Sequence, residues 1–151
     1  SKGWDLQTWY LLLMAYAASS IAFSMLAGVM VDRTGARSLM PLFTLPMVAG
    51  GLSLMGGGND VWIFGVLVSF GAAAGMTGAV TAPFWAEVYG VQHLGAIKAV
   101  ATAVMIFASA MSPAIYGAMF DAGITAPAIG MLNIVVVLAA SACAWLALRK
   151  S

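Results

Sequence analysis

Charged residues divide the chain into five long uncharged stretches. Each stretch holds the roughly 20 residues that a helix needs to cross a bilayer at about 1.5 Å per residue. A charge at the centre of a bilayer costs at least about 2.5 kcal/mol, so charges are expected near the helix ends. The pattern predicts an all-α, polytopic membrane bundle whose spans cover about residues 9–31, 38–57, 61–85, 99–120 and 124–148.

The composition leads to the same class of protein. Hydrophobic residues make up 63% of the chain and charged residues 7%, against roughly 45–50% and 25% in soluble domains. Because no internal linker or low-complexity stretch interrupts the pattern, residues 1–151 are expected to form one domain. Membrane lipid is therefore the first expected partner, and no nucleic-acid partner is expected.

The basic residues predict an orientation. If the turn between the first two spans is cytoplasmic, Lys2 alone lies on the outer side. Such an asymmetry in short loops follows the positive-inside rule, which places the N-terminus outside and the C-terminus in the cytoplasm. The expected location is the cell (inner) membrane. No signal peptide precedes the first span, so at least one upstream helix is expected. The basic residues on the inner side are then Arg33, Arg37, Lys98, Arg149 and Lys150.

Enzyme and metal chemistry find little support in the sequence. His93 is the only histidine and lies in a predicted inner loop, without a second histidine or a carboxylate at metal-ligand spacing. Neither H-E-x-x-H nor G-x-S-x-G occurs, and both are motifs of hydrolytic enzymes. Cys143 lies in the last span, where a small buried apolar role is expected. We therefore expect no metal, no cofactor and no enzyme activity.

Three spans carry patterns that bear on packing. The third span contains Gly71, Gly75 and Gly78, an extended G-x-x-x-G arrangement that lets another helix backbone approach closely. The last span is the most uniformly apolar, with Asn133 as its main polar exception, and is expected to face lipid. On the fourth span a polar stripe predicts either an interhelical hydrogen-bonding seam or a lined cavity; its members are Thr102, Met105, Ser109, Ser112 and Tyr116.

The loop after the first span carries a motif. From Gly28 to Arg37 it reads G-V-M-V-D-R-T-G-A-R, which resembles the G-x-x-x-D-R-x-G-x-R loop of the major facilitator superfamily of transporters. Ser38 follows where that family often has a basic residue. The run A-P-F-W-A-E-V-Y-G-V-Q-H-L-G-A-I-K over residues 82–98 is similar to a region of the monocarboxylate and oxalate–formate branches.

The resemblance implies a fold and an activity. The chain would supply helices eight to twelve of a twelve-helix carrier, and its partners would be the missing N-terminal helices and a small-molecule substrate. Helices two to six stay an alternative, because the same loop recurs between helices two and three and the two halves are related by an internal repeat. The expected activity is solute transport by alternating access.

The charged loop is a candidate conformational latch. Asp32 lies near the C-terminal end of its helix, where the macrodipole disfavours an anion, so it needs a partner. Glu87 is expected on the same side of the membrane as Arg33 and could join a carboxylate–guanidinium network. Alternatively, the charges simply anchor helix ends at the interface. The latch set is Gly28, Asp32, Arg33, Gly35, Arg37 and Glu87.

The resemblance also implies that the first, third and fourth spans line a substrate cavity. Because no charged residue lies inside a span, this part of the carrier would not itself grip a charged substrate, and a proton-coupling carboxylate would lie elsewhere. Two other functions stay open, namely a structural or regulatory half-size membrane subunit and an intramembrane enzyme completed by missing sequence. The cavity set is Tyr16, Ser20, Thr77, Met105, Ser109 and Ser112.

Overall fold

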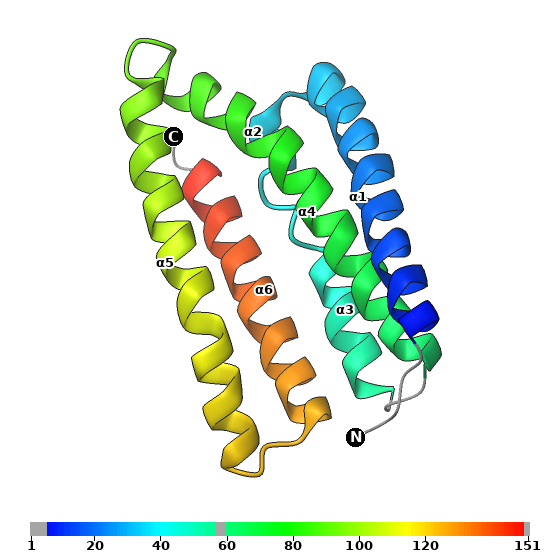
Figure 1. The fold of residues 1–151 in the computed structure, drawn as a ribbon. Coiled ribbons are helices and arrows are strands. Elements are labelled where there is room, and N and C mark those ends of the chain that lie inside the picture. The colour runs from blue at the N-terminus through cyan, green and yellow to red at the C-terminus, as the bar shows by residue number, and fades with distance from the viewer. Residues whose placement is uncertain (1–5, 57–59, 150–151) are drawn as a thin grey trace.

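The computed structural model describes residues 6–56 and 60–149, and every regular element in these two ranges is a helix (Figure 1). Lys2, Gly57 and Lys150, which enter the predictions above, lie outside the described residues. Four helices are long and apolar enough to cross a membrane, namely α1, α4, α5 and α6. The elements are α1 (Leu6–Thr34), α2 (Ala36–Leu39), α3 (Pro46–Met55), α4 (Asp60–Tyr89), α5 (Leu94–Asp121) and α6 (Ala126–Arg149).

Three long helices, α1, α4 and α5, extend at both ends beyond the boundaries that the charges predict, whereas α6 begins two residues later and ends one residue later than predicted. Asp32 and Arg33 lie in the last turn of α1, and Glu87 lies near the end of α4. Lys98 lies near the start of α5. A helix that passes the edge of the hydrocarbon layer can keep charged side chains at the interface, so a charge limits the apolar segment rather than the helix itself.

The prediction of one continuous helix over residues 38–57 is wrong. The chain forms the four-residue α2, a series of turns over 40–45 and the ten-residue α3. Pro41 and Pro46 cause the break, because neither can donate the backbone hydrogen bond that a continuous helix requires. The turn is held by shorter-range bonds such as Leu45 N–H to the Leu42 carbonyl, at 3.0 Å. The Thr44 and Ser141 hydroxyls, 2.8 Å apart, tie it to α6.

The helices pack in the order α1, α4, α3 and α6, and small residues mark each contact. The predicted approach of a backbone at the G-x-x-x-G stretch is confirmed for Gly71 and Gly75. A Cβ built on Gly71 would collide with the Tyr16 carbonyl of α1, and one built on Gly75 would lie 2.9 Å from the Ser24 nitrogen. Space remains around Gly78. Membrane helices associate closely through such residues because lipid provides no hydrophobic force between them.

The contact between α3 and α6 is equally close. A Cβ on Gly51 would lie 2.9 Å from the Gly130 carbonyl oxygen, and a Cβ on Gly130 would lie 2.6 Å from the Gly51 carbonyl oxygen. Ile129 and Val137 of α6 are buried as well. The prediction that the last span faces lipid is therefore wrong for this face of α6. The uniform apolarity of the span did not show which face would pack, because leucine and valine suit lipid and protein equally.

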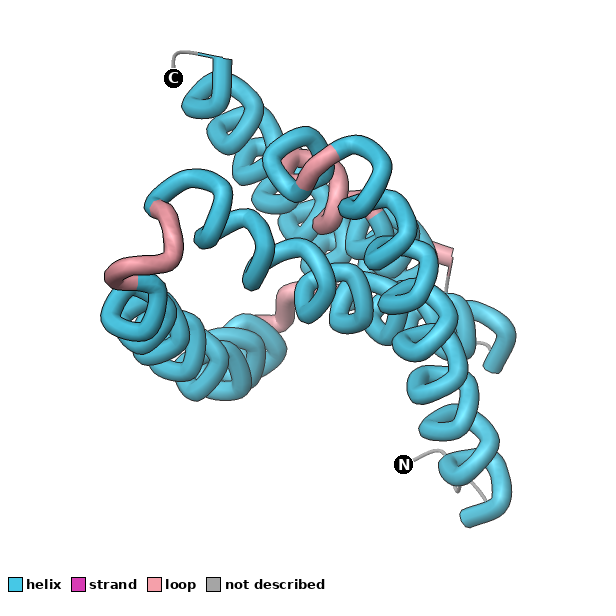
Figure 2. Tube along the Cα trace, turned by 90° about the horizontal axis from the view of Figure 1, so that it is seen from above, coloured by secondary structure: helices cyan, strands magenta, loops and turns pink. Residues whose placement is uncertain are grey.

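Helix α5 packs less closely than the helices α1, α4, α3 and α6. In Figures 1 and 2, α1 and α5 lie on opposite sides of the bundle. No residue of α5 is buried, although all of it is described, and its main packing contact is with α4. The small buried core, by contrast, joins α1, α2 and α4 through Ala27, Leu39 and Val80. The bundle thus has one tightly packed side and one loosely covered helix.

Candidate latch and cavity

Three of the predicted latch residues, Gly35, Arg37 and Glu87, meet where α1 ends, α2 begins and α4 ends. This is the upper end of the bundle in Figure 1, where α5 begins and α6 ends. Arg33, Arg37, Lys98 and Arg149 therefore share one end of the bundle. Asp121 lies at the other end, where α5 turns into α6.

Gly35 links α1 to α2 in a backbone conformation that favours glycine. Its φ is 79° and its ψ is 151°, a region that is essentially restricted to glycine. Its N–H donates to the Val31 carbonyl at 2.8 Å and so completes the end of α1. A Cβ here would meet the Glu87 carboxylate only at ordinary contact distance, 3.6 Å. The constraint at this position is therefore conformational rather than steric.

Glu87 connects α4 to the start of α2. The Ala36 N–H donates to its Oε1 at 2.8 Å, and the Arg37 N–H donates to its Oε2 at 3.0 Å. The first N–H groups of a helix have no partner within the helix, so a carboxylate can satisfy them. Both bonds are charge-assisted, which makes them stronger than bonds between neutral groups. We call this arrangement of Glu87, Ala36 and Arg37 the carboxylate clamp.

The clamp differs from the network that the sequence suggests. The two hydrogen bonds to Glu87 come from backbone N–H groups, and they span from α4 to α2 across the sequence. Asp32 and Arg33 are exposed, and no described residue forms a hydrogen bond or ion pair with either side chain. Nothing lies near Gly28 that a Cβ would meet. Within the described part of the chain, only Gly35, Arg37 and Glu87 of the predicted set take part in one contact.

A cavity of about 530 Å³ lies between α3, α4, α5 and α6. The Ser109 and Ser112 side chains line it from α5, as does Tyr116 one turn further along. From α6, Asn133 contributes an amide. The rest of the lining is apolar or aromatic and consists of Met47, Leu54, Val66, Phe70, Phe120, Ala126 and Ile129. This combination of an apolar wall with a few polar groups is typical of small-molecule sites.

Asn133 stands at the junction of two cavities. A second cavity, of about 300 Å³, shares Met47, Tyr116 and Asn133 with the first. Among the described residues, the buried Oδ1 of Asn133 has no hydrogen-bond partner. An unsatisfied buried carbonyl costs about 1–3 kcal/mol. A solute that donates a hydrogen bond here would recover part of that cost.

Of the six predicted cavity residues, the structure places two in the lining of the larger cavity and four elsewhere. Ser109 and Ser112 line the larger cavity. Tyr16 and Ser20 are half-buried at the contact between α1 and α4, where their carbonyls face Gly71 and Gly75. Thr77 donates to the Ala73 carbonyl of its own helix at 2.7 Å. Met105 is exposed and lines neither of the two cavities.

Two cavity residues were absent from the predicted cavity set. Tyr116 follows Ser112 by four residues and already belongs to the polar stripe, so helical phase alone could have found it. Asn133 is the main polar residue of an otherwise apolar span, and such residues usually face the interior of a bundle. Within the described ranges, no three histidine, cysteine or acidic side chains gather in a way that could hold a metal ion.

Comparisons of the chain with profiles of known protein families, with curated protein sequences and with solved structures found no match. The structure alone defines a helical protein with four candidate membrane-spanning helices.

Proposed function

We propose that this chain forms part of a carrier that moves a small solute across a membrane by alternating access. The observation that carries the proposal is the cavity at which Ser109, Ser112, Tyr116 and Asn133 converge. The loop from Gly28 to Arg37, which resembles that of the major facilitator superfamily, supports it. The carboxylate clamp adds a contact between helix ends at the membrane surface, where a latch would act.

The proposal includes five crossings, four by long helices and one by the broken segment. In Figure 1, the chain returns from the upper end of the bundle to the lower end through α2, the turns and α3. Broken helices are tolerated at membrane depth where neighbouring protein covers the backbone. Here α3 is covered by α4 on one side and α6 on the other. With Arg33, Arg37 and Arg149 in the cytoplasm, the first crossing starts outside.

The cavity suits a neutral solute with hydroxyl or amide groups. Its polar atoms are two serine hydroxyls, one phenol and one amide, and none of its lining side chains is charged. A charged solute would lose its hydration in this cavity without gaining an opposite charge, which is costly. The Ser112 hydroxyl donates to the Ala108 carbonyl of its own helix at 3.2 Å and so offers an acceptor. The Ser109 hydroxyl and the Asn133 amide can both donate and accept hydrogen bonds. In the proposed carrier, charged groups for an ionic substrate would come from other helices.

Cysteine accessibility at position 109 tests the proposal without knowledge of the substrate. The native Cys143 is exposed, contrary to the buried position expected from the sequence, so it is first replaced by serine. In this background, a Ser109→Cys thiol is expected to react with an impermeant maleimide added from either side of the membrane, because alternating access opens the cavity to each side in turn. Rates of labelling in oriented vesicles are the measurement.

The matched control is Ala110→Cys, on the next position of α5, which lines neither cavity. We expect its labelling to be slow from both sides. A Ser109→Cys thiol that reacts from one side only would contradict alternating access and favour a structural or regulatory subunit. A thiol at position 109 that reacts no faster than the one at position 110 would contradict a cavity that water can reach at Ser109.

The same cysteine-free background tests the proposed orientation. A Lys98→Cys thiol is expected to react only with reagent on the cytoplasmic side, and an Asp121→Cys thiol only with reagent on the outer side, because α5 runs between them. Labelling of intact cells and of inverted vesicles gives the two measurements. The reverse assignment of the two positions would overturn the orientation while leaving the fold unchanged.

A further inference from the structure

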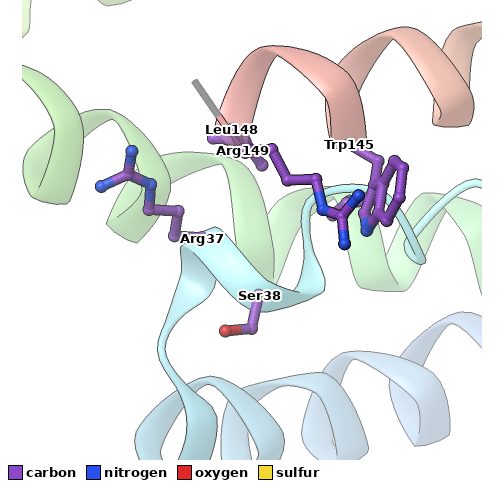
Figure 3. Close-up of a pocket in the computed structure, with 6 residues that line it drawn as sticks. Arg37, Ser38, Trp145, Leu148 and Arg149 are labelled. Atoms are coloured by element: carbon purple, nitrogen blue, oxygen red, sulfur yellow. The ribbon is translucent and has the colours of Figure 1, made fainter. Parts of the chain in front are cut away.

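A pocket between the start of α2 and the end of α6 is separate from both cavities and borders the carboxylate clamp at Arg37. Its volume is about 330 Å³ (Figure 3). Arg37, Ser38 and Pro41 line it from α2 and the turn that follows. Trp145, Leu148 and Arg149 line it from the last turns of α6. The pocket therefore lies at the basic end of the bundle, where the helices reach the membrane interface.

The lining combines positive charge with an apolar wall. Arginine is well suited to phosphate groups, because its planar guanidinium donates several hydrogen bonds in a fixed arrangement. The Arg149 guanidinium carbon lies 4.0 Å from the centre of the Trp145 ring, so a cation–π contact holds it at the edge of the pocket. None of the six lining residues is acidic. Among the described residues that line it, the pocket thus has the charge to attract an anion and no acidic side chain to oppose it.

The two arginines act from different edges of the pocket. In Figure 3, the Arg37 side chain points away from Arg149, and the Ser38 hydroxyl lies between α2 and the neighbouring helices. Arg37 also has an interaction of its own. Arg149, which the tryptophan positions, is therefore the principal ligand, while Arg37 adds positive potential and Ser38 is the nearest hydroxyl on α2.

The position of the pocket favours a lipid over a soluble anion. Trp145 is 47% exposed and lies one turn before Arg149, an arrangement typical of residues at the membrane interface. Pro41 and Leu148 provide apolar contacts beside the charged groups. Basic pockets between helices on the cytoplasmic side are known to bind anionic lipid headgroups, helped by the negative surface potential of that leaflet.

We propose that this pocket binds the phosphate of an anionic phospholipid, with the acyl chains lying against α6. The proposal requires that the helices cross a membrane, but it does not require that the protein transports a solute. It assigns Arg149 the role of headgroup ligand and Trp145 the role of positioning it. Labelling at position 109 tests the carrier separately, so the two proposals can fail independently.

The test compares lipid-dependent stability in nanodiscs. The protein is placed in phosphatidylcholine alone or in phosphatidylcholine mixed with phosphatidylglycerol, and its melting temperature is measured. We expect phosphatidylglycerol to raise the melting temperature, and Arg149→Gln to remove at least half of that increase. Arg149→Lys keeps the charge and is expected to retain most of it. In phosphatidylcholine alone, the variants should melt close to the parent protein, which excludes a general folding defect.

Lys98→Gln is the matched control, because Lys98 lies at the same end of the bundle but does not line the pocket. It should retain the full effect of phosphatidylglycerol. The proposal would be overturned if phosphatidylglycerol raised the melting temperatures of the parent protein and of Arg149→Gln equally. It would also be overturned if Lys98→Gln lost as much of that rise as Arg149→Gln. Inorganic phosphate is added to the phosphatidylcholine discs as a further arm. If it reproduces the whole increase, the pocket binds a free anion and the lipid assignment is wrong.

Discussion

Replacing Gly75 by alanine is expected to destabilise the bundle by about 1–3 kcal/mol, the usual cost of overpacking a tight contact. The added Cβ would meet the backbone of α1, at 2.9 Å from both the Ser20 carbonyl carbon and the Ser24 nitrogen. Backbone atoms cannot move aside by a change of rotamer, so the two helices must separate. The measurement is the free energy of unfolding in mixed micelles of a mild detergent and dodecyl sulfate.

Gly78→Ala is the matched control for this prediction. Gly78 lies on the same helix, and a Cβ at this position would meet nothing within 4 Å. Alanine also has a higher helix propensity than glycine. We therefore expect Gly78→Ala to be neutral or slightly stabilising. Equal stabilities of the two variants would show that α1 and α4 are not held together at Gly75.

Replacing Glu87 by alanine is expected to release α2 from α4. The change removes both acceptors of the carboxylate clamp, at 2.8 Å from the Ala36 nitrogen and 3.0 Å from the Arg37 nitrogen. A hydrogen bond to a charged group contributes about 1.5–3 kcal/mol when it is well shielded. Glu87 is exposed, so water can replace part of the hydrogen bonding in the variant. We therefore expect the free energy of unfolding to fall by about 1–2 kcal/mol. Hydrogen exchange of the amides in residues 36–39 should become faster, while exchange in α6 stays unchanged.

Asp121→Ala provides the control for Glu87→Ala. Asp121 is also an exposed carboxylate at the end of a long helix, but no described residue forms a hydrogen bond with its side chain. Removing an anion from a helix C-terminus is expected to be neutral or slightly stabilising. Unchanged exchange at residues 36–39 in Glu87→Ala would show that the clamp does not hold α2, and the latch would then lose its structural basis.

The four long helices could be predicted from the sequence because membrane thickness sets both their length and the position of charges. The second predicted span failed for a local reason. Its length and apolarity were sufficient, but Pro41 and Pro46 each withhold a backbone donor. Tolerance of proline in a membrane helix depends on neighbouring groups that satisfy the freed carbonyls. The sequence alone does not reveal which neighbours a broken segment will have, and here the turns are tied to α6 by the hydroxyl contact between Thr44 and Ser141.

The candidate site could be predicted only in part. Helical phase on α5 was enough to place Ser109 and Ser112 on one face, and both line the same cavity. Grouping them with Tyr16 required knowledge of tertiary packing. The glycines of α4 bring α1 so close that Tyr16 lies at a helix contact instead. The target of Glu87 was equally hidden, because it depends on how Gly35 turns the chain into α2. The roles of these residues in transport stay predictions.

The broken segment has a consequence for how the protein is made. With ten residues, α3 is too short to enter a bilayer by itself, because an independent helix needs about 20. The residues that cover it are synthesised later. They include α4 and Gly130 of α6, which contact α3, and Ser141 of α6, which contacts the preceding turns at Thr44. Until α6 emerges from the ribosome, the turns around Pro41 and Pro46 lack their final neighbours. In the proposed five-crossing topology, residues 36–55 would integrate late, once a helix far downstream in the chain has been inserted.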